Sequence, residues 1–204
     1  MARLRRSREL NLKILILCEG KTEKNYLLEI KNQLPREKQR GIQIDVEEFK
    51  RNDPLNLVNE SIRRKQRAKL EGAPYDIIWV VFDHDNLPNR DKAFIKANSN
   101  SIEVAYSSIN IEFWYVIHFQ YSTKQFSNGD ECKRYLTKNF IPDYKPGKTR
   151  MLPYLEKNLE KAYKNAVSLR LYKQAEIESG VKEWEANPYL TIDKLIEFMY
   201  GLKN

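Results

Sequence analysis

Three carboxylates stand in the chain where a parallel sheet would bring them together. Glu19 follows the apolar run Ile14–Cys18, and Asp83 and Asp85 follow a second apolar run, Ile77–Phe82. A spacing of two residues puts both aspartates on one side of a chain that is still extended. If the two runs are neighbouring strands, all three side chains converge beyond the carboxyl ends of the strands, which is where parallel sheets bind ligands.

Carboxylates placed in this way suit a divalent cation. Three anions repel one another, and burying them without partners costs several kcal/mol, whereas Mg²⁺ prefers oxygen ligands and meets phosphate groups. We therefore expect Glu19, Asp83 and Asp85 to bind Mg²⁺ or Mn²⁺. Taken singly, each motif also has a structural interpretation, because Asp-x-Asp after a strand is often a turn or a helix cap. His84, between the two aspartates, is expected to be exposed or capping rather than a ligand.

The residues that follow Glu19 suit a phosphate group. Gly20 removes a side chain where a ligand could approach the backbone, and a helix expected from Thr22 would point its amino-terminal N–H groups toward the same crevice. Lys21 would add a positive charge. Glu23 is interpreted either as a supporting residue of the metal site or as an acid that complements the helix dipole.

A fourth acid, Glu112, stands at the start of another expected helix, directly after the fourth strand. Its carboxylate could enter the same crevice and serve a second metal ion, or it could be an ordinary acid at a helix amino terminus. His118 lies six residues further on and off that helical face. We therefore favour a packed, hydrogen-bonded core histidine over a catalytic base.

The net charge of +8 is concentrated in two basic zones. The first ten residues carry four arginines, and residues 133–173 carry eleven basic and three acidic residues, whereas residues 11–132 carry equal numbers of each sign. Such zones attract polyanions through Coulomb forces and counterion release, although a solvated surface is the ordinary alternative. The residues expected to contact nucleic acid are Arg3, Arg5, Arg6, Lys21, Lys145, Lys148 and Arg150. Tyr135 and Tyr144 could stack on bases or be half-buried core residues.

The spacing of apolar residues predicts an alternating order of strands and helices. Strands are expected over residues 13–18, 42–49, 76–82 and 102–106, with helices between them from Thr22, from Asp53 and over 91–97. This order is typical of a mostly parallel four-stranded sheet with helices on both faces. Further helices are expected over 111–121, over 152–171 and after Pro188. We therefore expect a basic amino-terminal arm (1–12), an α/β domain (13–122) and a helical, basic carboxyl-terminal portion (123–204) packed on it.

Length and composition exclude several classes of protein. With 204 residues, 41% of them hydrophobic, the chain suits one globular domain with a sizeable core. No apolar run has the length of a membrane helix or of a signal peptide, so neither is expected. The two cysteines, Cys18 and Cys132, lack the spacing of a zinc site. A disulfide scaffold is therefore excluded, and a reducing, cytoplasmic setting is expected.

Four segments of the chain together resemble the RloB-like family of the Toprim superfamily. They are Ile14–Leu28, Trp79–Leu87, Ile111–Phe119 and Asn187–Phe198. That superfamily has a compact, Toprim-like parallel sheet that is shared by topoisomerases, bacterial primases and OLD-family nucleases. The resemblance implies that Glu19, Asp83 and Asp85 are metal-site residues, and that Glu112 and His118 occupy positions of the family's motif.

The resemblance also implies a function in prokaryotic anti-phage defence of the abortive-infection kind, beside an ATPase of the AAA or ABC type. Related Toprim effectors cleave nucleic acid, and tRNA is an attested target class. The leading hypothesis is a Mg²⁺-dependent nuclease acting on RNA or DNA, in which Asp83 and Asp85 hold the metal and Glu19 is a ligand or a general acid–base. Two alternatives stay open: a non-catalytic regulatory or binding subunit of the ATPase complex, and a nucleotidyl-transfer enzyme, because Toprim sites also serve primases.

Overall fold

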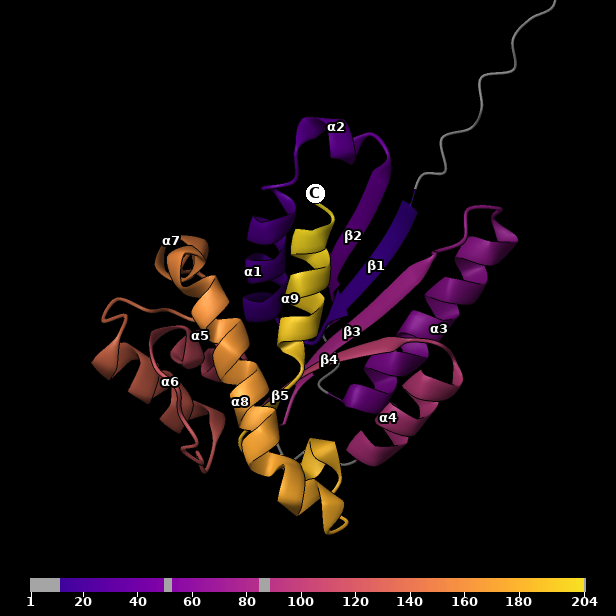
Figure 1. Ribbon diagram of the computed structural model, residues 1–204. Helices are drawn as coiled ribbons and strands as arrows, with labels where there is room; N and C mark the ends of the chain where they lie inside the picture. Colours follow the sequence, from indigo (N-terminus) through magenta and orange to yellow (C-terminus); the bar gives the residue numbers. More distant parts are fainter. Residues whose placement is uncertain (1–11, 50–52, 85–88, 204) are drawn as a thin grey trace, which may run out of the picture.

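The computed structural model describes residues 12–49, 53–84 and 89–203. These residues form a five-stranded sheet in the order β2-β1-β3-β4-β5 (Figure 1). The strands β1 (Leu12–Cys18), β2 (Ile42–Glu48), β3 (Ile77–Asp83) and β4 (Glu103–Ser108) are parallel, and β5 (Tyr189–Leu190) runs antiparallel to β4. The predicted mostly parallel sheet is confirmed, with β5 as an additional strand.

The two strands that precede the acidic residues are neighbours in the sheet. β1 pairs with β2 on one side and with β3 on the other, in a register that sets Cys18 beside Val81. Alternate residues of β1 point to opposite faces, so that Ile16 enters one hydrophobic core and Leu17 enters another. Burial on both faces explains why these strands are apolar throughout.

Helices cover both faces of the sheet (Figure 1). One core joins the sheet to α3 (Pro54–Leu70) and α4 (Arg90–Ser99). The other core joins it to α1 (Lys21–Lys31), α5 (Ile111–Phe119) and α9 (Ile192–Gly201). A single helical turn, α2 (Arg36–Gln39), precedes β2. The arrangement is the layered α/β architecture that the alternation of elements predicts.

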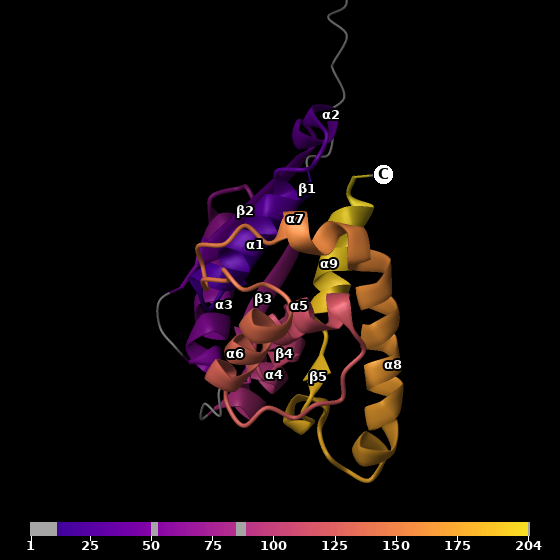
Figure 2. The same cartoon turned by 90° about the vertical axis from the view of Figure 1, so that its left-hand side faces the viewer.

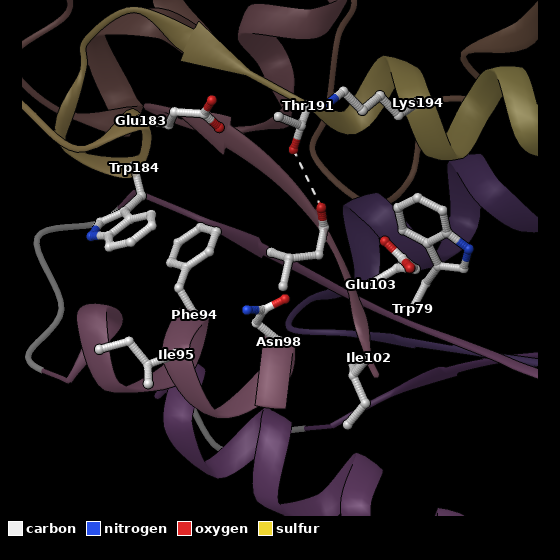
Figure 3. A pocket seen from close by; sticks show the side chains of 11 residues that line it. Trp79, Phe94, Ile95, Asn98, Ile102, Glu103, Glu183, Trp184, Thr191 and Lys194 are labelled. Carbon is white, nitrogen blue, oxygen red and sulfur yellow. Dashed lines mark hydrogen bonds between the residues drawn. The ribbon is translucent and has the colours of Figure 1, made fainter. Parts of the chain in front are cut away.

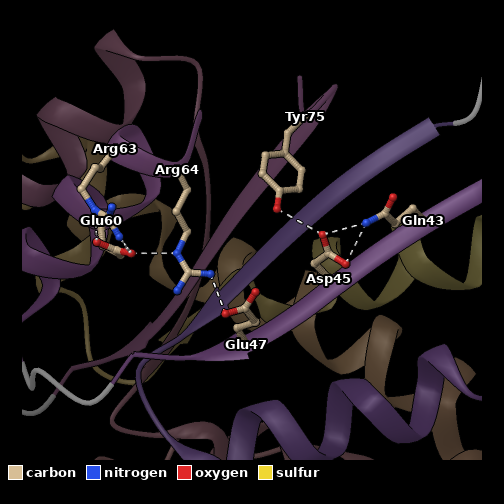
Figure 4. A network of polar contacts seen from close by, with 7 residues as sticks. All are labelled: Gln43, Asp45, Glu47, Glu60, Arg63, Arg64 and Tyr75. Atoms are coloured by element: carbon tan, nitrogen blue, oxygen red, sulfur yellow. Dashed lines mark hydrogen bonds and ion pairs between the residues drawn. The ribbon is translucent and has the colours of Figure 1, made fainter. Parts of the chain in front are cut away.

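Ion pairs connect α3 to the edge strand β2 (Figure 4). Arg64 places Nη1 2.6 Å from a carboxylate oxygen of Glu47 in β2, and its Nε lies 2.8 Å from Glu60 of α3, which also binds Arg63. The hydrogen bond from Arg63 is the largest cause that lowers the pKa of Glu60 to about 2. Arg63 and Arg64 are therefore both paired with carboxylates, and Arg64 joins α3 to β2.

The helical carboxyl-terminal portion packs on the sheet through α5. Eight residues of α5 are buried. This helix is covered not only by the sheet but also by α6 (Gly129–Asn139) and α8 (Leu159–Glu178), which both contact it. The single helix expected over 152–171 is instead α7 (Leu152–Leu155), a 3₁₀ turn η1 (Glu156–Asn158) and α8. Neither α8 nor any other helix in the described part of the chain has the length and apolar character of a membrane span.

α6 and β5 are among the elements that were not predicted, because their sequence patterns are weak. α6 is mostly polar and buries only Cys132 and Leu136. Asn128, the residue before this helix, caps its amino terminus. The Asn128 side chain accepts a hydrogen bond from the backbone N–H of Glu131 at 2.9 Å, which is a favourable helix cap. β5 has two residues and owes its conformation to pairing with the end of β4, so that tertiary contact rather than local sequence makes it a strand.

The core position of α5 can be tested at Trp114. This side chain is fully buried, and its Nε1 donates a hydrogen bond to the Tyr26 hydroxyl at 3.1 Å. Trp114→Ala should lower the free energy of unfolding by about 3–5 kcal/mol, because it leaves a cavity. Leu70→Ala, at a side chain that is 89% exposed, should change it by less than about 0.5 kcal/mol. Urea denaturation measures both, and equal stabilities would contradict the packing described.

Candidate functional site

The carboxylate of Glu19 reaches from the end of β1 to the end of β3. The Glu19 backbone N–H donates to the carbonyl of Val81 at 2.9 Å, which extends the strand pairing by one residue. The Glu19 Oε2 atom accepts a hydrogen bond from the backbone N–H of Asp83 at 3.3 Å. The structure therefore brings Glu19 and Asp83 together at the carboxyl ends of two adjacent parallel strands, whereas Asp85 lies outside the described residues.

Glu23 fills the space that Gly20 leaves open. A Cβ atom at Gly20 would lie 2.8 Å from the Glu23 Oε2 atom, so the absence of a side chain permits the Glu23 carboxylate to fold back toward the start of α1. That oxygen is buried and has no hydrogen-bond partner among the described residues. A buried acceptor of this kind needs a proton or a cation, and because Glu23 also stands in the first turn of α1, both interpretations given for it stay predictions.

The environment of Glu23 raises its pKa to about 7, chiefly because burial disfavours the charged form. The negative charges of Glu112 and Glu19 raise the pKa further, while a backbone hydrogen bond and the Asp83 side chain act in the opposite direction. The four carboxylates of Glu19, Glu23, Asp83 and Glu112 therefore form one electrostatically connected group, which we call the acidic cluster.

Glu112 enters this cluster from the first turn of α5. Its side chain is almost fully buried, and its Oε1 atom accepts a hydrogen bond from the Tyr144 hydroxyl at 2.7 Å. Burial is the main cause that raises the pKa of Tyr144, and the charge of Glu112 is the next. The charge of Glu112 acts on Glu23, and Glu112 is also the acid in the first turn of α5, so both interpretations given for this residue stay predictions.

The chemistry of the acidic cluster suits a hard divalent cation, since all its donor atoms are carboxylate oxygens. The unpaired Oε2 atom of Glu23 supports this fit. Within the described ranges, however, no three histidine, cysteine, aspartate or glutamate side chains are arranged to hold one metal ion. The predicted set of Glu19, Asp83 and Asp85 includes a residue beyond those ranges, so it stays a prediction.

His84 is buried, and the expectation that it is exposed or capping is wrong. Its Nδ1 atom lies 2.5 Å from the Tyr106 hydroxyl, which lies 2.6 Å from the carbonyl oxygen of Trp184. The carbonyl can only accept, so the single phenol proton goes to Trp184 and His84 Nδ1–H donates to Tyr106. Burial, followed by the charge of Arg90, lowers the pKa of His84 to about 4. This neutral histidine anchors the chain directly after Asp83.

The other histidine is packed as expected. His118 is fully buried, with Nδ1 2.8 Å from the carbonyl oxygen of Trp114 and its ring against the Trp114 ring at a centroid distance of 4.5 Å. Burial lowers its pKa to about 4. His118 is therefore a core residue in this structure.

Four of the basic residues predicted to bind nucleic acid lie near one another beside α1. Lys21, Lys145, Lys148 and Arg150 are all exposed, and we call them the basic rim. The loop that carries the last three is held against α1, because Asn25 Nδ2 donates to the Gly147 carbonyl at 2.8 Å. A Cβ atom at Gly147, where φ is +65°, would lie 3.2 Å from the Cβ of Lys21. Arg3, Arg5 and Arg6 lie outside the described residues.

The end of this loop is also attached to α1. The Glu29 carboxylate accepts hydrogen bonds from the backbone N–H groups of Met151 and Leu152 at 3.0 and 3.1 Å. Within the loop, Tyr144 is buried, so the stacking role considered for it is wrong and the core alternative is confirmed. Tyr135 is partly buried, and its hydroxyl accepts from Gln120 at 2.6 Å. No periodic pattern in the sequence marks Tyr144 as the partner of a buried acid.

A separate cavity of about 410 Å³ lies between α4, α9 and the edge of β4 (Figure 3). The rings of Phe94 and Trp184 stack there at a centroid distance of 4.6 Å, and Thr191 contacts the carbonyl of Val104 at 3.3 Å. None of the four residues of the acidic cluster lines this cavity. An indirect connection runs through the carbonyl of Trp184, which accepts a hydrogen bond from the Tyr106 hydroxyl, and through the contact of that hydroxyl with His84.

Comparison with known proteins gives one family match. A family model described as RloB-like protein matches residues 14–199, which includes the acidic cluster and the basic rim. Neither the curated proteins nor the solved structures gave a match.

The raised pKa of Glu23 predicts a pH dependence of stability. Between its ordinary value of 4.5 and about 7, the folded protein binds more protons at this site than the unfolded chain does. In metal-free buffer the free energy of unfolding should therefore fall as the pH rises through this window. The part due to Glu23 is on the order of 2–3 kcal/mol.

Urea denaturation at several pH values, with chelator present, measures this dependence. Glu23→Gln, which cannot ionise, should reduce the fall in stability between pH 4.5 and 7. Glu37→Gln, on the short helix α2, should leave the profile unchanged. Parallel profiles for the wild type and Glu23→Gln would show that Glu23 does not hold a proton as described.

Proposed function

Because the chain belongs to the RloB-like protein family, we propose that it is a Mg²⁺-dependent nuclease that hydrolyses phosphodiester bonds in RNA, with tRNA as a candidate, or in DNA. The observation that carries this proposal is the contact between the Glu19 carboxylate and the backbone of Asp83. It places two acids at the carboxyl ends of adjacent parallel strands, where sheets of this kind bind their ligands. The proposed setting is prokaryotic defence, with an ATPase of the AAA or ABC type as a partner.

The proposed ligands of the cation are Glu19, Asp83 and Asp85. A bound Mg²⁺ or Mn²⁺ would polarise a phosphoryl oxygen and lower the pKa of a bound water molecule, so that hydroxide is available at neutral pH. Glu19 either remains a ligand or exchanges a proton with the reacting groups. Glu112, whose carboxylate accepts a hydrogen bond from Tyr144, would add a fourth acid beside these ligands.

The basic rim supports the choice of a nucleic acid as substrate. Lys21 is the first residue of α1, and the loop that carries Lys145 and Lys148 passes beside this end of the helix at Gly147, whereas Arg150 lies toward Glu29. The N–H groups of that helix end add a partial positive charge. Together they provide phosphate-binding groups next to the acidic cluster, so a phosphodiester chain held by the rim passes close to the proposed metal.

Replacement of Asp83 tests the catalytic proposal. Asp83→Ala should reduce metal-dependent cleavage of total tRNA, single-stranded DNA or duplex DNA by at least about a thousandfold, because the cation loses a ligand. Asp130→Ala, at an exposed carboxylate of α6, is the matched control and should cleave normally. Circular dichroism establishes that both variants fold.

Three outcomes would contradict the nuclease proposal. Undiminished metal-dependent cleavage by folded Asp83→Ala would exclude this residue from the site. A folded wild-type protein that cleaves none of these nucleic acids but forms a stable ATPase complex would instead indicate a regulatory subunit. Incorporation of nucleotides in place of hydrolysis would indicate a nucleotidyl-transfer enzyme.

Charge reversal on the basic rim tests nucleic-acid binding separately from cleavage. The double variant Lys145→Glu/Lys148→Glu should weaken binding of a tRNA or DNA ligand and reduce the slope of log K against log salt by about 2, since two phosphate contacts are lost. Lys69→Glu/Lys96→Glu, on α3 and α4, makes the same change in net charge elsewhere on the surface. Fluorescence anisotropy at several salt concentrations measures both, and equal slopes would place the binding surface elsewhere.

A further inference from the structure

The outward face of α8 carries large apolar side chains that contact water. Val167, Leu171 and Tyr172 are 49%, 64% and 60% exposed. Figure 2 shows α8 along one edge of the molecule, where no other ribbon lies outside it. Val167 and Leu171, one turn apart on the same side of the helix, form an apolar patch of the kind that marks an interaction surface, and Tyr172 lies to one side of it.

Most of the exposed residues of α8 form a single strip, whereas Lys161 and Tyr172 lie to one side of it. Positions 164, 167, 168, 171, 174, 175 and 178 are all exposed, and their spacing of three or four residues puts them on one side of the helix. Leu171 is at the centre of the strip, and the small residues Ser168 and Ala175 lie near it. Lys164 and Glu178 stand near its two ends, each seven residues from Leu171, and the exposed Glu160 lies one turn before Lys164.

We propose that this strip binds a second copy of the chain, with two α8 helices packed antiparallel about a two-fold axis at Leu171. A two-fold axis requires a surface that complements itself, and the strip satisfies that requirement. Leu171 meets its own counterpart, and Val167 meets Ala175 of the second copy. The small side chains of Ser168 and Ala175 allow the helix axes to approach closely.

The charged residues near the ends of the strip favour this antiparallel register over other registers. In it, Lys164 of each copy lies opposite Glu178 of the other, so opposite charges meet at both ends of the strip. Lys164 makes no ion pair or side-chain hydrogen bond with the described residues, so its charge is available. A shift of one helical turn toward the amino terminus would place Glu160 opposite Glu178, and the like charges would oppose that alternative.

The groove beside the strip enlarges the surface that a second copy can cover. It has a volume of about 640 Å³ and lies between Tyr163 and Val167 of α8 and Lys194 and Glu197 of α9. Specific interfaces bury about 1,200–2,000 Å² in total, and one helix per copy falls at the small end of that range. The dimer should therefore dissociate in the micromolar range, and it does not depend on the proposed nuclease function.

Sedimentation velocity at protein concentrations from about 1 to about 200 µM tests the proposal. The wild type should change from monomer to dimer across this range, and Leu171→Glu should remain monomeric. Ile95→Glu is the matched control, because Ile95 on α4 is also 64% exposed, and it should dimerise like the wild type. A wild type that is monomeric throughout would overturn the proposal and leave the strip to a different protein partner.

Charge reversal tests the register without removing apolar surface. Lys164→Glu and Glu178→Lys should each weaken dimerisation by about tenfold, because each creates two contacts between like charges across the axis. The double variant restores opposite charges and should recover wild-type dimerisation to within about threefold. A double variant as weak as the single ones would overturn the proposed arrangement.

Cysteine cross-linking tests directly where the two-fold axis lies on α8. Cys18 and Cys132 are buried, so a cysteine introduced on α8 is more accessible than either of them. Leu171→Cys should form a covalent dimer rapidly with copper–phenanthroline as oxidant. A mixture of Lys164→Cys and Glu178→Cys proteins should cross-link more than either protein alone. Yields no higher than that of Ile95→Cys would overturn the proposal.

Discussion

The parallel pairing of β1 with β3 is the constraint on which the candidate site depends. Their register ends with Cys18 beside Val81, and the side chain of Glu19, the next residue along the chain, reaches the backbone N–H of Asp83 at 3.3 Å. Helices α1 and α5 then place Glu23 and Glu112 in the same small volume. A change of one residue in this register would turn the acids toward opposite faces of the sheet.

Repulsion between the like charges at this position is reduced by specific contacts, in addition to the partial exposure of Glu19 and Asp83 to water. Tyr144 donates a hydrogen bond to Glu112, a backbone N–H donates to Glu19, and burial raises the pKa of Glu23 to about 7, so that this residue keeps its proton to a higher pH than an exposed glutamate does. These contacts hold the acids close together at a free-energy cost that folding elsewhere must offset. Such an arrangement is typical of functional sites, where pKa values are strongly perturbed.

The fold was predictable where the residue pattern of a single strand or helix is enough to identify that element. β1 and β3 are apolar on both faces, and both acidic motifs follow them directly, so the approach of Glu19 to Asp83 could be inferred from the sequence. The buried state of His84 could not, because its partner Tyr106 is 22 residues away, and no local pattern connects them.

The same limit applies to residues brought together by the carboxyl-terminal helices. Tyr144 is 32 residues from Glu112, and β5 is a strand only because the end of β4 is available to pair with it. Tertiary contacts decide such positions, and they leave no periodic trace in the sequence. Predictions for Asp85 and for the arginines of the amino-terminal arm fall outside the described residues.

The position of α9 has a consequence for the order in which the molecule can form during synthesis. This helix packs beside α1, and its Phe198 lies against Trp79 of β3, so contacts join segments more than a hundred residues apart. On a ribosome that makes the amino-terminal end first, β1 and α1 emerge with an apolar face that has nothing to cover it. Contacts of such long sequence separation also slow folding. The acidic cluster should therefore mature late, after the segment near residue 200 has left the exit tunnel, and chaperones have most of that interval in which to bind the nascent chain.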